Sequence, residues 1–266
     1  MIKHNWEETP IKLPTNENKL LEQVINIIND NEEIKTLWRV NNVNAIERLG
    51  MSDHGPVHFQ IVSNMALRMT RIFKEANIEF SISKNYGLSS DYAEVIIVLA
   101  SLMHDLGISI HRKGHEEYSL FLANNLLREI LSFMPVYERT IVISETLHAI
   151  ISHRAGGSPL TIEAGIVRVS DALDMSKGRS RIPYEAGNVD IYSVSAQAVD
   201  SVEIEKGVET IVQINIKMNN SAALFQVDDL LNTKIKGSGI ENYVAVRAYI
   251  DRETEKSIVK EYIFKK

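Results

Sequence analysis

The sequence predicts a mainly α protein that ends in a small α+β domain, on the evidence of two patterns. From Glu17 to Leu49, and again over most of residues 56–173, apolar residues recur every three or four positions, as on one face of a helix. In the last third of the chain apolar and polar residues alternate, which is typical of strands. We therefore predict a helical domain over residues 1–184 and an α+β domain over residues 188–266.

The N-terminal helices, within residues 1–50, are separated by a predicted break. The apolar period stops at Asn29-Asp30-Asn31, a polar cluster of the kind that interrupts helices. A further helix is predicted from about Pro56 to Glu75. Proline fits its first turn, because the N–H that proline lacks would have no partner there.

A long apolar helix is predicted for Tyr92–Leu106. Asp91 stands where a side-chain oxygen caps a helix N-terminus, and Gly107 stands where glycine commonly ends a helix. The same apolar spacing continues beyond this point. It predicts three more helices, at about residues 115–132, 136–153 and 160–173.

The C-terminal domain begins with a predicted hairpin that turns at Lys206-Gly207. Helical spacing returns over residues 221–235. Two strands, YVAVRAYI and SIVKEYIF, are then predicted on either side of the polar turn DRETEK. This domain contains no cluster of catalytic residue types, so we expect it to pair across a dimer or to form a lid.

Composition narrows the classes of function. The 266 residues are 44% hydrophobic and carry a net charge of −6, which does not favour a binder of nucleic-acid polymers or anionic membranes. No apolar run approaches the roughly 18 residues that span a bilayer, and the first residues lack the apolar core of a signal peptide. The absence of cysteine excludes disulfides and thiolate zinc sites. We expect a cytoplasmic protein.

Histidines concentrate in the helical domain. Seven of the eight lie between His54 and His153: His54, His58, His104, His111, His115, His148 and His153. Neutral imidazoles bind divalent metals well, and a neighbouring carboxylate adds the negative charge that a cation needs. The adjacent pair His104-Asp105 would diverge by about 100° on a continuing helix. At a helix that ends near Gly107 the two side chains can converge on one ion.

Asp171 is a second candidate ligand. It lies in the apolar segment IVRVSDALDM, where an unpaired buried carboxylate would be costly. Its partner is expected to be a cation, a hydrogen-bond network, or an arginine such as Arg168 or Arg179.

These elements together resemble the HD superfamily of metal-dependent phosphohydrolases. The resemblance rests on H58-x3-V62, H104-D105-x-G107, H115, A149-I150-x2-H153 and D171-A172, in this order, and covers about residues 54–184. It implies an HD-type helical bundle. It also implies that His58, His104, Asp105 and Asp171 hold a core metal ion, and that His115 and His153 hold a second ion with Asp105 as the bridge.

The sequence departs from the fullest family pattern at two positions. Arg154 stands where certain two-metal members have a further histidine, and Ile108 stands where some members have a lysine. The expected cofactor is therefore one or two divalent ions, among Mn²⁺, Fe²⁺, Co²⁺, Ni²⁺, Zn²⁺ and Mg²⁺ without ranking.

Several other side chains are predicted to serve the reaction or the substrate. Asp105 would orient a water molecule activated by the metal, with Arg154, His111 and Arg112 as further catalytic candidates. The predicted substrate-binding residues, a pocket histidine and basic side chains suited to an anion, are His54, Lys113, Arg179 and Arg181.

The predicted function is hydrolysis, by metal-activated water, of a phosphoester or phosphoanhydride of a nucleotide or another small phosphorylated molecule. An alternative is a catalytically weak module that senses or binds a nucleotide in the same metal pocket. A third is a metal oxygenase or lyase on the same scaffold. We expect a homo-oligomer that is not bound to a membrane.

Overall fold

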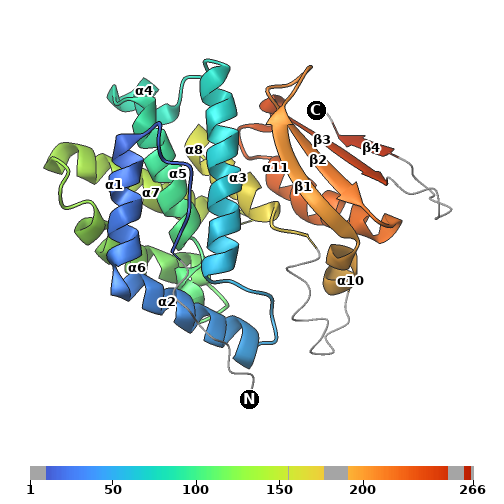
Figure 1. The fold of residues 1–266 in the computed structure, drawn as a ribbon, viewed down its shortest axis with the longest axis horizontal. Coiled ribbons are helices and arrows are strands. Elements are labelled where there is room, and N and C mark those ends of the chain that lie inside the picture. Colours follow the sequence, from blue (N-terminus) through green and yellow to red (C-terminus); the bar gives the residue numbers. More distant parts are fainter. Residues whose placement is uncertain (1–9, 155, 177–190, 251–260, 265–266) are drawn as a thin grey trace.

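The computed structural model describes residues 10–154, 156–176, 191–250 and 261–264. In Figure 1 most of the helices lie on one side and a small sheet lies on the other, together with α10 (Ile191–Gln197) and α11 (Thr233–Ile235), and α3 (Pro56–Glu75) is next to the sheet. The predicted fold class, mainly α with a small C-terminal α+β part, is confirmed. The predicted domain boundary, between residues 184 and 188, lies outside the described residues.

The N-terminal helices follow the predicted break. Helix α1 covers Lys19–Asp30, and α2 covers Glu32–Asn42 and continues into a π-helical turn, η1, over Val43–Arg48. The break is a single residue, Asn31, whose side chain accepts a hydrogen bond from the backbone N–H of Ile34 at 2.9 Å. Asparagine is a favoured N-cap because its side chain satisfies an N–H without a helical partner.

The helices of the bundle begin close to their predicted positions. Helix α3 covers Pro56–Glu75, and a short helix that was not predicted, α4, covers Ser81–Tyr86. The remaining helices are α5 Ser90–Met103, α6 His115–Ile130, α7 Val136–Ser152 and α8 Ile162–Ala172.

Helix α5 differs from its prediction at both ends. Asp91 lies in the first turn and forms an ion pair with Lys74 instead of capping the helix. The helix ends at Met103, and a 3₁₀ turn, η2, follows over Leu106–Ser109. Gly107 lies within this turn and has no positive φ. It therefore does not end the helix in the left-handed conformation that the prediction assumed.

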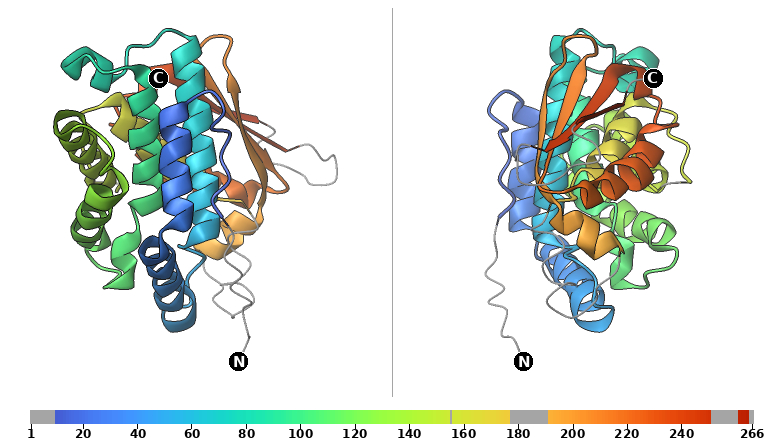
Figure 2. Two further views of the ribbon diagram at one scale, coloured as in Figure 1. Left: turned by 60° about the vertical axis from the view of Figure 1, so that its left-hand side comes forward. Right: turned by 90° about the vertical axis from the view of Figure 1, so that its right-hand side faces the viewer.

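Helix α5 is also the centre of the bundle. The segment Ser90–Ser109 is long and apolar enough to cross a membrane by length and composition, contrary to the expectation from the sequence, but 89% of that window is buried within the protein. In the left view of Figure 2, α5 (green) lies between α1 (blue) and α7 (olive). Its apolar surface is thus covered by the rest of the chain, as in the core helix of a globular protein.

The C-terminal part contains a four-stranded sheet in the order β1-β2-β3-β4. The predicted hairpin is confirmed, since β1 and β2 pair antiparallel, and the two later strands also pair antiparallel. Strands β2 and β3 pair parallel, which requires a crossover between them. The strands are β1 Val199–Lys206, β2 Val212–Met218, β3 Val244–Ile250 and β4 Glu261–Phe264.

The crossover from β2 to β3 is helical, as predicted for residues 221–235. It consists of short turns, η3 Ser221–Ala223, η4 Gln226–Asn232, α11 Thr233–Ile235 and η5 Glu241–Tyr243. Helix α10, Ile191–Gln197, precedes the sheet. Buried apolar residues from the bundle, the crossover and the sheet form one continuous core, so the C-terminal part is packed against the helical part.

Candidate metal centre

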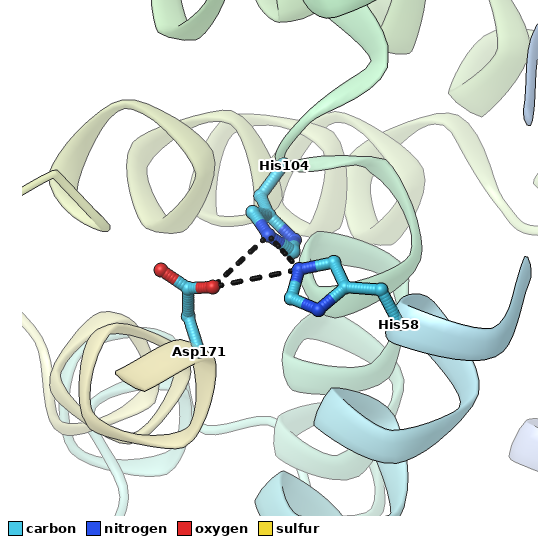
Figure 3. A group of neighbouring side chains, drawn as sticks. All are labelled: His58, His104 and Asp171. Atoms are coloured by element: carbon cyan, nitrogen blue, oxygen red, sulfur yellow. Dashed lines mark hydrogen bonds and ion pairs between the residues drawn. The ribbon is translucent and has the colours of Figure 1, made fainter. Parts of the chain in front are cut away.

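Three helices place one side chain each at a common buried point (Figure 3). His58 comes from the first turn of α3, His104 from the residue that follows α5, and Asp171 from α8. The Nε2 atoms of the two histidines are 3.2 Å apart, and each lies 3.5 Å from Oδ1 of Asp171. Two donors about 2.1 Å from one ion are about 3.0–3.4 Å apart. The three side chains therefore fit one divalent cation.

Asp105 brings a second set of donors to the same centre. Its Oδ2 faces the first group, at 3.8 Å from His58 Nε2 and 3.5 Å from His104 Nε2. Its Oδ1 faces the other way, at 2.9 Å from His115 Nε2 and 3.8 Å from His153 Nε2. One carboxylate with an oxygen toward each group is the arrangement that a bridging ligand requires. All six predicted metal ligands thus converge.

The histidine rings are oriented by hydrogen bonds at Nδ1. His104 Nδ1 lies 2.9 Å from the Ser101 carbonyl and His153 Nδ1 lies 2.6 Å from the Ile150 carbonyl, and both carbonyls can only accept. Nδ1 therefore carries a proton in both rings, and Nε2 is the nitrogen that can bind a metal. His115 differs, because its Nδ1 contacts both the carbonyl and the guanidinium of Arg112.

His58 is oriented by a carboxylate that was not predicted from the sequence. Asp174 Oδ2 lies 2.6 Å from His58 Nδ1, and both residues are buried. A carboxylate behind a metal-binding imidazole fixes its orientation and increases its basicity as a ligand. Asp174 lies one helical turn after Asp171. A second aspartate at this spacing could have indicated a carboxylate that supports the metal centre.

We expect Asp174→Asn to weaken metal binding by about 10–100-fold, because the amide cannot supply the negative charge behind His58. Titration of the purified protein with Mn²⁺, followed by electron paramagnetic resonance, measures the affinity. Asp228→Asn, on the exposed side of η4, is the control. Equal Mn²⁺ affinity in the two variants would contradict a role for Asp174.

The turn that carries His104 and Asp105 is held from the side by α2 and η1. Three side chains spaced three residues apart, Trp38, Asn41 and Asn44, donate to the backbone carbonyls of Leu102, Asp105 and Ile108, at 3.0, 2.9 and 2.7 Å. A helix end leaves carbonyls without helical partners, and these donors satisfy carbonyls at the end of α5 and in the turn beyond it. The N-terminal helices thereby fix the position of the His-Asp pair.

Helix α6 holds the same turn from the other side. Ser119 Oγ accepts from the backbone N–H of Gly107 at 2.8 Å and donates to the carbonyl of His104 at 2.7 Å. The approach is close, since a Cβ on Gly107 would lie 2.0 Å from the carbonyl oxygen of His115. Glycine is needed here for space between backbones.

The charges in the centre favour cation binding. Burial would raise the pKa of Asp105, but His104 and His115 outweigh it and hold that pKa well below its usual value. The pKa of Asp171 is likewise low, because Lys234 and His104 outweigh burial. Burial, together with the charges of His104 and Lys234, lowers the pKa of His153 to about 3. Burial would lower the pKa of His104, but Asp105 and Asp171 outweigh it and raise that pKa, so a divalent ion would bind there in place of the proton on Nε2. The two ionised carboxylates and the neutral imidazole of His153 are the forms that bind a divalent ion.

A cavity of about 580 Å³ adjoins the centre, with His115 in its wall. Besides His115, its lining includes four basic or imidazole side chains, Arg48, His111, Arg112 and Lys113. Apolar side chains (Leu49, Ile108 and Ile110) and the acidic Glu116 complete much of the remaining wall. The three residues predicted at 111–113 are thus next to the centre. Arg48, on η1, was not predicted.

Other predicted residues lie elsewhere or outside the described chain. Arg154 does not join the centre, since its guanidinium forms an ion pair with Glu117 at 2.8 Å and is largely exposed. Its catalytic role stays a prediction that this geometry does not support.

His54 is buried beside His58, with 5.6 Å between ring centroids. Arg179 and Arg181 lie outside the described residues. Asp171 faces the metal centre, and its ion pair is with Lys234, whose Nζ lies 2.9 Å from Asp171 Oδ2. The sequence offered an arginine, Arg168 or Arg179, as the alternative partner and did not point to this lysine.

Comparison with known proteins agrees with this geometry. The HD domain family matches residues 58–176, a stretch that includes all six converging side chains. The chain is also 42% identical over 224 residues to the uncharacterized protein MJ1020 of Methanocaldococcus jannaschii, an alignment that covers 84% of this chain and 86% of that protein. The chain therefore belongs to the HD superfamily of metal-dependent phosphohydrolases.

Proposed function

We propose that this protein hydrolyses a phosphoester or phosphoanhydride bond of a nucleotide or another small phosphorylated molecule. One observation carries the proposal: four imidazoles and two carboxylates from separate helices meet at one buried point, with the two oxygens of Asp105 facing two donor groups. A divalent ion at such a centre lowers the pKa of a bound water and withdraws charge from a phosphoryl oxygen.

The residues of this chain have distinct proposed roles. His58, His104 and Asp171 would hold the first ion, His115 and His153 would hold a second, and Asp105 would supply one oxygen to each group and orient the attacking water. The burial of these groups strengthens their interactions with charge, because little bulk water screens them.

The adjoining cavity is proposed to hold the rest of the substrate. Arg48, Arg112, Lys113 and His111 supply positive charge for phosphate oxygens, and the apolar side chains offer a surface for an uncharged group such as a base. His54, beside His58, is proposed to contact the substrate as well. Cytoplasmic location and a homo-oligomeric state remain part of the proposal.

The test is a panel of nucleotides and small phosphate esters incubated with the purified protein and Mn²⁺, Fe²⁺, Co²⁺, Ni²⁺, Zn²⁺ or Mg²⁺. Phosphate or dephosphorylated product, released from at least one compound and stopped by a chelator, is the expected result. Metal and nucleotide binding without turnover across the panel would favour the sensing module instead.

Arg48 provides a test of the cavity. We expect Arg48→Met to raise KM for the substrate about 10-fold, with kcat changed less than about 3-fold, because a lost contact to a non-reacting phosphate oxygen weakens ground state and transition state alike. Steady-state kinetics measure both constants. Arg154→Met is the matched control and should change neither. A large fall in kcat for Arg154→Met would restore the catalytic role predicted from the sequence.

A further inference from the structure

A lysine from the C-terminal part reaches the metal centre. Lys234 belongs to α11, in the crossover between β2 and β3, and lies 63 residues after Asp171 in the chain. Its Nζ donates to Asp171 Oδ2 at 2.9 Å and also to the backbone carbonyl of His153. One ammonium group thus contacts two of the six converging residues. The side chain is largely buried, with 16% exposed.

The segment that carries Lys234 is fixed to α8 by Arg168. This buried guanidinium donates to the backbone carbonyls of Lys234 at 2.8 Å and Thr233 at 3.2 Å. It also donates to the carbonyls of Arg154 and Gly157, in the loop that follows His153. Through these hydrogen bonds Arg168 connects α11 and the loop after α7 to α8, the helix that carries Asp171.

A glycine on α8 allows the same segment to approach closely. A Cβ on Gly165 would lie 2.3 Å from the carbonyl oxygen of Ser238. Gly165, Arg168 and Asp171 are spaced three residues apart, so they lie along one side of α8. Each contacts the chain between residues 233 and 238. This side of α8 therefore packs against the crossover and keeps it next to the metal centre.

The contact with Lys234 gives the two oxygens of Asp171 different partners. Oδ2 faces the ammonium, whereas Oδ1 faces Nε2 of His58 and of His104 at 3.5 Å. A carboxylate free to rotate would present either oxygen, or both, to an ion. Hydrogen-bonded partners behind a ligand keep it in one orientation.

We propose that Lys234 is a positioning residue of the metal centre, which holds Asp171 with a single oxygen toward the ion. The proposal rests on the proposed function and adds that the C-terminal part completes the site. This contribution was not predicted from the sequence, because a lone lysine in a helical segment carries no pattern.

The test compares three variants of the full chain. Lys234→Met removes the charge and the hydrogen bonds but retains the length of the side chain. Lys236→Met removes the same charge from the exposed neighbour in the same segment. Lys234→Arg retains a cationic donor. The dissociation constant for Mn²⁺, measured by electron paramagnetic resonance, is the main readout, and the Tm of the metal-free protein shows whether each variant is folded.

We expect Lys234→Met to bind Mn²⁺ at least 10-fold more weakly than the wild-type protein, Lys236→Met to bind it equally well, and Lys234→Arg to recover most of the loss. Unchanged or tighter binding by Lys234→Met, or equal loss in both methionine variants, would overturn the proposal. Tight Mn²⁺ binding by a wild-type protein that hydrolyses nothing would contradict the function alone, whereas no Mn²⁺ binding by the wild-type protein would overturn both.

Discussion

Replacement of Asp105 by asparagine should lower kcat on the order of 1000-fold or more and reduce the amount of metal bound per chain. Loss of a partner behind a ligand typically costs 10–100-fold in affinity or activity. The loss should be larger for Asp105, which is itself a proposed ligand, because each of its oxygens faces a different donor group. An amide has one oxygen and an NH₂ group that repels cations, so asparagine cannot serve both groups.

The measurements are steady-state kinetics on the substrate found in the panel and elemental analysis of the purified variant. Asp91→Asn is the matched control, since Asp91 lies at the opposite end of α5 and pairs with Lys74 at the surface. Activity within a few-fold of wild type in Asp105→Asn would remove Asp105 from the reaction. Equal losses in both variants would point to a general effect on α5.

Replacement of Gly107 by alanine should destabilise the fold by about 3 kcal/mol, near the upper end of what overpacking usually costs. The new methyl group would lie 2.0 Å from the His115 carbonyl oxygen and 2.7 Å from the Ser119 nitrogen. Both atoms are backbone, so no side-chain rotation relieves the contact. The structure must separate η2 from α6, which moves His115 away from Asp105.

Urea unfolding of the variant, monitored by circular dichroism, measures the loss. Gly156→Ala is the control, because nothing lies within 4 Å of the position that a Cβ would take there, and it should change the free energy of unfolding by less than about 1 kcal/mol. A Gly107→Ala protein with wild-type stability would show that the two backbones separate at little cost.

The sequence predicted best those features that local chemistry specifies. Pro56 and Asn31 mark helix starts because a missing N–H or a short polar side chain suits only that position. The family resemblance placed His58, His104, Asp105 and Asp171 together, and the structure brings them together. The end of α5 was predicted less well, since Gly107 serves a close approach between segments that periodicity cannot show.

Features that depend on tertiary contacts were not predictable from the pattern. Asp174 orients His58 across 116 residues of sequence, and Lys234 reaches Asp171 from a different part of the fold. Arg154 was a candidate because it follows His153, yet its side chain is largely exposed and forms an ion pair with Glu117. A position next to a predicted metal ligand in the sequence therefore did not place the Arg154 side chain in the metal centre.

The parallel pairing of β2 with β3 places the proposed positioning residue late in the chain, after all the side chains of the metal centre. The crossover demanded by this pairing carries Lys234, and β3, which follows it, ends only at Ile250. On the ribosome, His58 through Asp171 emerge well before this segment. With the proposed role of Lys234, truncated chains that end before this segment should therefore retain ions poorly even though they contain all six converging side chains.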